Sequence, residues 1–342
     1  MPIYYIVIAI VVIAIAFLFF NPFKGDDVTE EQTPDNETVQ PEAKVVQVEV
    51  RHSQPLGAEP AAKTPAGGSV TEKQTEDNFD NVLIAADGQV GDRVMALLKD
   101  AQNDIAAGRI LSARETLNDV LNMPMNAGVR NNVKRQLTAI ADEWLFGRTI
   151  LYGDNLCSTY KVQPGDMLSQ IAKKYNVPYQ FIMRINNISS EKSLRVGQNL
   201  KVVQGPFHGI VYCSTFTMDL YLQNVYVKSF RVGLGKEGKD TPIGRWRAKL
   251  GGKLIKPTWT DPDTGQTFQS DDPNYPLGSG WIALEGIDPR TRGISGIALH
   301  GTKDEDSIGT RSSRGCLRLF NGELLEVYNM FEHGKSELRI VE

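Results

Sequence analysis

The chain has 342 residues, which is enough for two or three domains. Its formal net charge is −4 at pH 7 and no block of the sequence is strongly basic, which argues against nucleic acid as a partner. The 31 glycines and 17 prolines favour linkers and tight turns over one compact helical body.

The N-terminal region contains a long apolar segment. Residues 3–20 carry no charged side chain, and a helix of this length spans about 27 Å, close to the thickness of a hydrocarbon core. We therefore expect a transmembrane anchor over residues 1–23. A cleaved signal peptide is the alternative, because Ala14 and Ala16 have the spacing of a cleavage site. The anchor is favoured because the apolar run continues to Phe20 and no basic segment precedes it.

Two segments of different composition follow. Acidic residues, Pro, Thr and Gln dominate residues 24–85, which predicts a disordered linker. Between residues 86 and 150, three sets of apolar residues recur at helical spacing, with breaks at Gly108 and over residues 123–128. We expect two or three antiparallel helices there, weakly similar to a tetratricopeptide-type unit, that act as a spacer or docking segment.

The segment 158–204 predicts a strand, two short helices and a closing strand. Gly165 follows a proline and turns the chain, and Asp166 is placed to cap a helix. Apolar residues then follow at positions i, i+3, i+4 and i+7, namely Leu168, Ile171, Ala172 and Tyr175. A second apolar set precedes the strand-like run 200–203, so the whole is a compact α+β unit.

This segment resembles a LysM domain, with a βααβ fold, over its whole length. The resemblance rests on the stretches PGDMLSQIAKKY (164–175), INNI (185–188) and VGQNLKV (196–202). It implies binding to glycans that contain N-acetylglucosamine, such as peptidoglycan or chitin. Loops supply the implied sugar contacts, and the expected glycan-binding residues are Gly165, Asp166, Asn187 and Ile188.

Short strands are predicted over residues 208–342. Alternating apolar residues on both sides of Gln223 and Asn224 predict a hairpin. Further strand-like runs cover residues 281–284 and 296–300, with connections rich in Gly and Pro between them. The last domain is therefore expected to be mainly β.

Cys316 lies in a polar, glycine-flanked stretch and is one of three cysteines. A cysteine attacks as a thiolate and needs a base nearby. Of the four histidines, His300 ends an apolar run and is followed by Gly301, which leaves room for a ligand. The other three are most simply linker or surface residues: His52, His208 and His333. His300 is therefore the candidate base.

Four ordered motifs resemble the L,D-transpeptidases with a YkuD-type catalytic domain. They are TPIG (241–244), NYPLG (274–278), HG (300–301) and SRGC (313–316). The resemblance implies a mainly β catalytic domain over residues 208–342 that uses no cofactor and no metal. It also implies peptidoglycan stem peptides as the substrate.

The resemblance implies a role for each matching residue. Cys316 is the nucleophile, and His300 is the general base and then acid, paired with it as an imidazolium–thiolate couple. The carbonyl of Gly301 orients the second ring nitrogen of His300. The backbone N–H groups of Gly315 and Cys316 are the expected oxyanion donors. Three further residues are expected to contact substrate or to shape the loop: Ser313, Arg314 and Arg318.

Arg314 departs from the family pattern, in which a histidine often precedes the Gly-Cys pair. A guanidinium has a pKa above about 12, so it cannot act as a base, although it favours a thiolate nearby. The base assignment therefore rests on His300 alone, and Arg314 becomes a candidate for substrate binding.

Several alternatives compete with this interpretation. A papain-like cell-wall peptidase also combines with LysM domains, but in those families the cysteine precedes the histidine. A Cys157–Cys213 disulfide would bracket the LysM-like segment and leave Cys316 unpaired. The Asp-rich stretch 261–272 has the wrong spacing for a calcium loop and is expected to be a polar flap over the active site. A catalytically silent glycan-binding scaffold is the non-enzyme alternative, which the intact Cys316 and His300 disfavour.

These features together predict a single-pass protein of the cell membrane whose catalytic domain faces the periplasm or cell wall. The enzyme is expected to form 3→3 cross-links in peptidoglycan through a cysteine acyl-enzyme. Water as the acceptor would make it an L,D-carboxypeptidase instead.

Overall fold

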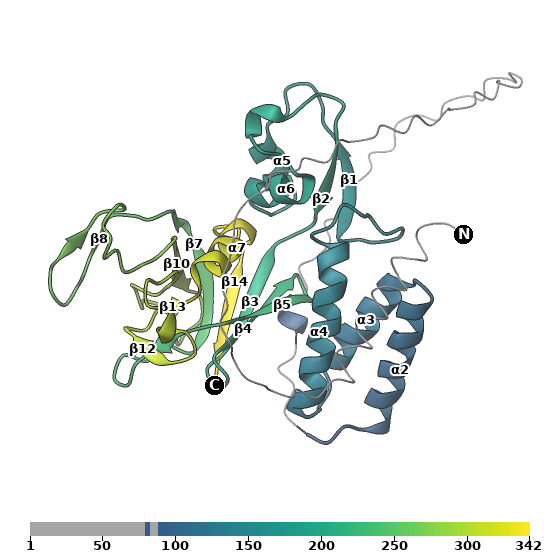
Figure 1. The fold of residues 1–342 in the computed structure, drawn as a ribbon, viewed down its shortest axis with the longest axis horizontal. Coiled ribbons are helices and arrows are strands. Elements are labelled where there is room, and N and C mark those ends of the chain that lie inside the picture. The colour runs from purple at the N-terminus through teal and green to yellow at the C-terminus, as the bar shows by residue number, and fades with distance from the viewer. Residues whose placement is uncertain (1–78, 83–87) are drawn as a thin grey trace, which may run out of the picture. The chain divides into compact units, whose positions relative to one another are not determined.

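The computed structural model describes residues 79–82 and 88–342 of the chain (Figure 1). The predicted anchor over residues 1–23 and almost all of the predicted linker lie outside these residues. In the described part of the chain, no helix is long and apolar enough to cross a membrane.

Three α-helices form what we call the helical module, residues 88–150. They are α2 (Asp92–Ala106), α3 (Ile110–Leu121) and α4 (Ala127–Trp144). Gly108 separates α2 from α3 with a φ of 73°, which glycine adopts without steric cost. Asn126 caps α4, because its side chain accepts a hydrogen bond from the Val129 N–H at 3.0 Å.

The next segment, residues 157–204, is the βααβ module. Its elements are β1 (Cys157–Lys161), α5 (Leu168–Lys174), α6 (Tyr179–Asn186), the short 3₁₀ helix η2 (Glu191–Ser193) and β2 (Asn199–Val203). Strands β1 and β2 pair antiparallel, with Cys157 opposite Val203. The predicted α+β unit is therefore confirmed.

The predicted helix cap at Asp166 was wrong. Helix α5 begins after Met167, and no side chain caps it. The Asp166 carboxylate instead accepts hydrogen bonds from the Gln163 N–H at 2.7 Å and from the Tyr160 hydroxyl at 2.8 Å. Asp166 therefore closes the turn before the helix, because the donors of that turn lie within its reach.

The remaining residues, 207–342, form the sheet domain. Its eight-stranded sheet has the order β13-β11-β10-β7-β14-β3-β4-β5. The strands are β3 (Phe207–Tyr212), β4 (Thr217–Leu222), β5 (Val225–Arg231), β7 (Gly244–Leu254), β10 (Trp281–Gly286), β11 (Ala298–His300), β13 (Leu317–Arg318) and β14 (Glu337–Val341). The prediction of a mainly β domain is confirmed.

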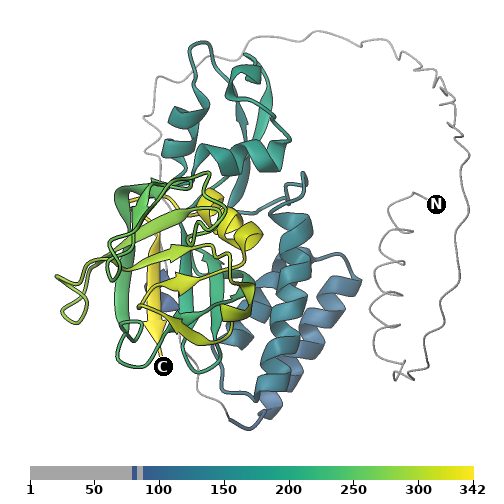
Figure 2. The ribbon, with the colours of Figure 1, turned by 60° about the vertical axis from the view of Figure 1, so that its left-hand side comes forward.

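Smaller elements complete the sheet domain. Two short pairs join β6 (Leu234–Gly235) to β12 (Arg311–Ser313) and β8 (Trp259–Thr260) to β9 (Thr267–Phe268). The 3₁₀ helix η3 (Glu305–Ser307) precedes β12, and helix α7 (Asn321–Met330) follows β13. Figures 1 and 2 both show α7 lying beside the sheet, and the β8–β9 hairpin projecting from it.

His208 lies in the core, so its prediction as a surface residue was wrong. Its side chain is buried, its ring stacks on Phe79 with centroids 4.2 Å apart, and its Nδ1 accepts a hydrogen bond from the Glu337 N–H at 3.0 Å. Phe79 belongs to the 3₁₀ helix η1 (Phe79–Asn81), inside the range predicted as linker. The linker prediction was wrong for these residues because Phe79 finds an aromatic partner on β3.

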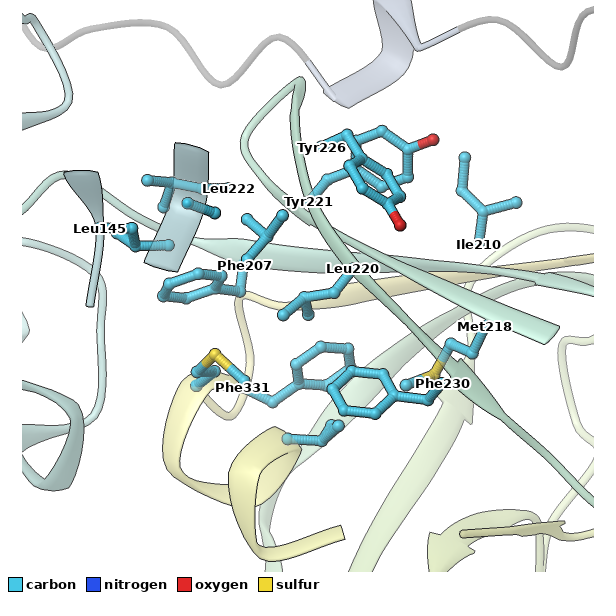
Figure 3. Close-up of a cluster of buried hydrophobic side chains, with 14 of the residues drawn as sticks. Leu145, Phe207, Ile210, Met218, Leu220, Tyr221, Leu222, Tyr226, Phe230 and Phe331 are labelled. Atoms are coloured by element: carbon cyan, nitrogen blue, oxygen red, sulfur yellow. The ribbon is translucent and has the colours of Figure 1, made fainter. Parts of the chain in front are cut away.

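One hydrophobic core continues through all three parts of the described chain. Figure 3 shows Leu145, which directly follows α4, beside Phe207 and Leu222 of the sheet. The rings of Phe181 in α6 and Phe207 in β3 meet edge-to-face with centroids 4.9 Å apart. All four side chains are fully buried, so each part contributes to the packing of the others.

Candidate active site

Two short parallel strands bring the predicted nucleophile and base together. Strand β11 pairs with β13, so that Leu299 lies opposite Leu317 and His300 opposite Arg318. Side chains two residues apart on a strand share a face. Cys316 directly precedes β13, two residues before Arg318, and so lies on the same side of the sheet as His300.

His300 is held by two contacts in a buried position. Its Nδ1 lies 2.5 Å from the carbonyl oxygen of Gly301, and its ring stacks on Trp281 with centroids 5.7 Å apart. A carbonyl oxygen only accepts hydrogen bonds, so Nδ1 carries the proton and Nε2 is left as the acceptor. Gly301 thus makes the contact that the resemblance implies for it.

The pKa shifts of His300 and Cys316 both favour the neutral form of the side chain. Burial lowers the pKa of His300 to about 4, although the hydrogen bond to Gly301 opposes this, and the charge of Arg318 lowers it further. Burial also raises the pKa of the Cys316 thiol, while a hydrogen bond with the backbone of Ala298 and the charge of Arg318 act in the opposite direction. Burial therefore favours the neutral form of each group, and the expected imidazolium–thiolate couple stays a prediction.

Cys316 sits at the end of a tight loop. Its thiol donates a hydrogen bond to the carbonyl oxygen of Gly296 at 3.3 Å. Gly315 has a φ of 107°, and a Cβ there would lie 3.2 Å from the Cδ1 of Ile297. Only glycine holds this conformation without strain, so it fixes the approach of the chain to the nucleophile.

Ser313 shapes this loop and is buried within it. Its hydroxyl donates to the carbonyl oxygen of Cys316 at 2.6 Å and accepts from the Gly315 N–H at 3.2 Å. Both hydrogen bonds stay inside the loop, which favours the loop-shaping role over contact with substrate. The Gly315 N–H, an expected oxyanion donor, is therefore hydrogen-bonded to Ser313.

Arg314 contacts the protein rather than lying free for substrate. Its Nη1 and Nη2 each lie 3.2 Å from an oxygen of Asp261, and its Nε lies 2.7 Å from an oxygen of Asp263. Both aspartates belong to the turn of the β8–β9 hairpin (Figure 1). The backbone N–H groups of Asp263 and Thr264, together with Arg314, lower the pKa of Asp261. Arg314 therefore ties this hairpin to the loop that carries the nucleophile.

We expect Arg314→Gln to release the hairpin while leaving the sheet folded. Backbone amides over residues 258–269 should exchange hydrogen faster, and kcat/KM should fall by up to about fivefold, because partly exposed ion pairs contribute at most about 1 kcal/mol. Arg311→Gln is the matched control, since Arg311 lies in β12, three residues before Arg314, and pairs with Asp240 at 3.6 Å rather than with Asp261 or Asp263. If amide hydrogen exchange in the hairpin is the same in Arg314→Gln as in wild type, Arg314 does not hold the hairpin to the nucleophile loop.

Arg318 is the cation of the site. Its charge acts on both Cys316 and His300, and its Nη1 lies 4.0 Å from Asp304 and 3.3 Å from the hydroxyl of Ser312. Its buried Nε makes no hydrogen bond. Arg318 therefore supplies a positive charge beside the nucleophile.

A cavity of about 210 Å³ opens next to the reacting pair. Its walls include Gly296, whose carbonyl binds the Cys316 thiol, and Trp281, which stacks on His300. Lys249 and Glu285 supply one positive and one negative charge to the same walls. Trp281 was missed by the sequence analysis, where it marked only the start of a predicted strand.

The other predicted sites were placed as follows. Cys157 and Cys213 are buried and both are free thiols, so the alternative of a disulfide between them is not realised in the structure. Burial is the main cause that raises the pKa of Cys157 to about 12, which makes it unreactive. Within residues 79–82 and 88–342, no group of His, Cys, Asp or Glu side chains is arranged to hold a metal ion.

The predicted glycan-binding residues lie on two turns of the βααβ module. Gly165 has a φ of 87° in the turn that Asp166 closes. Asn187 has a φ of 53° where α6 ends, and Ile188 follows it with its backbone N–H bonded to the Met183 carbonyl oxygen. Their observed contacts shape the turns, and sugar binding by them remains a prediction.

A buried histidine at the end of β11 and a half-buried cysteine directly before β13, preceded by a glycine of positive φ, are what a cysteine-dependent acyltransferase site requires. Residues 207–340 match the L,D-transpeptidase catalytic domain family (YkuD), and residues 160–203 match the LysM domain family. The sheet domain is therefore a YkuD-type L,D-transpeptidase catalytic domain, and the βααβ module is a LysM domain. The combination is consistent with a peptidoglycan L,D-transpeptidase targeted to the cell wall, in a family that uses a cysteine nucleophile.

Two relatives by sequence and one solved structure illustrate what the chain is similar to. YkuD of Bacillus subtilis, which is classed as an L,D-transpeptidase, is 26% identical over 183 residues, which cover 52% of this chain and 94% of that protein. YbiS of Escherichia coli K12, classed likewise, is 34% identical over 99 residues, which cover 27% of this chain and 31% of that protein. Among solved structures, an L,D-transpeptidase from Mycobacterium smegmatis matches with 14% identity and a TM-score of 0.31, over 43% of this chain and 64% of that one.

Proposed function

We propose that this protein forms 3→3 cross-links in peptidoglycan. The observation that carries the proposal is the pairing of β11, which ends at His300, with β13, which begins directly after Cys316. The acyl donor is a stem tetrapeptide, cleaved at the L-to-D bond after the diamino acid in position three. The acceptor is the side-chain amine of a second stem.

The chemistry runs through two transfers of an acyl group. The Cys316 sulfur attacks the carbonyl carbon as its proton passes to Nε2 of His300, and the tetrahedral oxyanion forms near the backbone of Gly315 and Cys316. His300 then protonates the leaving D-alanine amine as the C–N bond breaks. The acceptor amine attacks the thioester, gives its proton to His300, and the released thiolate takes that proton back.

The uncharged resting pair suits this sequence of steps. An imidazole with a pKa near 4 remains neutral at pH 7 and can take a proton only when the thiol attacks. Arg318 supplies the positive charge that favours the thiolate at that moment. It is also our candidate for binding a carboxylate of the stem peptide.

Targeting is assigned to the other parts of the chain. The LysM domain would hold glycan strands through the loops at residues 165–168 and 187–190, raising the local concentration of the catalytic domain at its polymer. The apolar segment 3–20 would anchor the protein in the cell membrane, with the catalytic domain on the wall side.

The test is product analysis on purified tetrapeptide muropeptides. We expect a cross-linked dimer together with one released D-alanine per link, detected by mass spectrometry. Release of D-alanine with hydrolysed monomer alone would assign a carboxypeptidase instead. If there is no turnover but the LysM domain still binds peptidoglycan, the protein is a glycan-binding scaffold instead.

A further inference from the structure

Asn321 is the first residue of α7, and it hydrogen-bonds to two loops, residues 278–279 and residues 301–302, the second of which directly follows His300. Its Oδ1 accepts a hydrogen bond from the Ser279 N–H at 2.9 Å, and its Nδ2 donates to the carbonyl oxygen of Thr302 at 2.8 Å. Its own carbonyl oxygen accepts a hydrogen bond from the Ser279 hydroxyl at 2.8 Å. The side chain therefore uses its donor and its acceptor at once.

The Asn321 side chain also packs closely against two glycines. A Cβ on Gly301 or on Gly278 would collide with the Asn321 Oδ1 in each case. The amide therefore lies against the backbone of Gly301, the residue whose carbonyl oxygen faces Nδ1 of His300. Glycine at both positions is what lets the side chain approach this closely.

These contacts fix the direction of the Gly301 carbonyl from both sides. On one side the Thr302 carbonyl is held by Asn321, and on the other the carbonyl oxygen of His300 accepts a hydrogen bond from the Leu319 N–H at 3.0 Å. A carbonyl that cannot rotate keeps the proton of His300 on Nδ1 and leaves Nε2 as the acceptor. The base is active only in that tautomer.

We propose that Asn321 is a positioning residue for the catalytic base, which sets the tautomer of His300 through the carbonyl of Gly301. Asparagine is suited to this role because it offers a donor and an acceptor without charge. Aspartate would keep the bond from Ser279, lose the bond to Thr302, and place a negative charge beside the Gly301 carbonyl.

The test compares Asn321→Asp and Asn321→Leu with wild type in the full-length chain labelled with ¹⁵N-histidine and held in detergent. Two-bond ¹H–¹⁵N spectra report the tautomer of each ring, and His300→Gln assigns the His300 signals. We expect the Nδ1-protonated form alone in wild type, and a mixture of both tautomers in the two variants.

A matched control comes from the LysM domain. Asn186 also uses both ends of its amide, since its Oδ1 accepts from the Lys201 N–H at 2.7 Å and its Nδ2 donates to the carbonyl oxygens of Ile182 and Lys201. Asn186→Asp should lower stability comparably while leaving the His300 tautomer unchanged. A His300 spectrum identical to wild type in folded Asn321 variants would overturn the proposal. So would failure of both variants to fold while Asn186→Asp folds, since that would show a purely structural role.

The kinetic arm of this test rests on the proposed function. There we expect kcat to fall by about 10- to 100-fold with KM little changed, because the base is misoriented while the binding surface is intact. If the proposed function fails, wild type itself shows no transfer, whereas the tautomer shift remains measurable. The two failures are thereby distinguished.

Discussion

Cys316→Ala is expected to abolish acyl transfer and leave the protein folded. Removal of the sulfur removes the covalent step, and loss of a nucleophile in a comparable triad lowers kcat by roughly 10⁶-fold. The substitution only shortens a half-buried side chain, and it removes a weak thiol hydrogen bond to Gly296 and a contact with the backbone of Ala298. The measurement is intact-mass spectrometry with a carbapenem, which should add one acyl group to wild type and none to the variant.

The control for this experiment is Cys213→Ala. Cys213 is a buried thiol of the same domain whose pKa is raised by burial, so it takes no part in the reaction. That variant should form the adduct as wild type does. An adduct on Cys316→Ala, or none on wild type, would remove Cys316 from the mechanism.

His300→Gln is expected to lower kcat/KM by about 10²–10⁴-fold, because a general base is lost. The pH dependence of wild type should carry the signature of a buried imidazole. Its pKa is lowered to about 4, so the neutral base is present above that pH, and activity should fall as the pH drops through about 4. An exposed histidine would give this decline near pH 6.5.

Two controls distinguish protonation of the catalytic base from unfolding of the protein at low pH. His208→Gln removes another buried histidine that also bonds to the backbone, and it should leave the acid limb of kcat/KM in place. Circular dichroism at each pH tests the fold, because a histidine buried in its neutral form makes the folded state less stable as the pH falls from 6.5 toward 4. An acid limb near pH 6.5 in a fully folded protein would contradict the buried, neutral base.

The sequence signals that led to the two domain assignments are local. The LysM domain shows its strands and helices within about 45 consecutive residues, and its apolar spacing alone predicts both helices. His300 and Cys316 are recognisable because each stands next to a glycine in a short ordered motif. Such signals survive without knowledge of the rest of the fold.

The interpretations that failed or fell short depend on residues far apart in the chain. Arg314 meets Asp261 across 53 positions, so nothing near Arg314 predicted this ion pair, and substrate binding by Arg314 stays a prediction. His208 is buried against Phe79, which lies in a segment whose composition favours disorder. Asn321 was not singled out in the sequence analysis, because the loops that it joins come from residues 278–279 and 301–302.

The shared core has a consequence for how this protein unfolds. Phe181 of the LysM domain packs on Phe207 of the catalytic domain, and Glu326 of α7 pairs with Arg184 at 3.1 Å and Lys228 at 2.7 Å. Unfolding of either domain alone would expose a buried aromatic ring and leave charged groups of the ion-pair network without their partners. We therefore expect the two family domains to unfold as one cooperative unit in heat and in denaturant, although sequence comparison separates them.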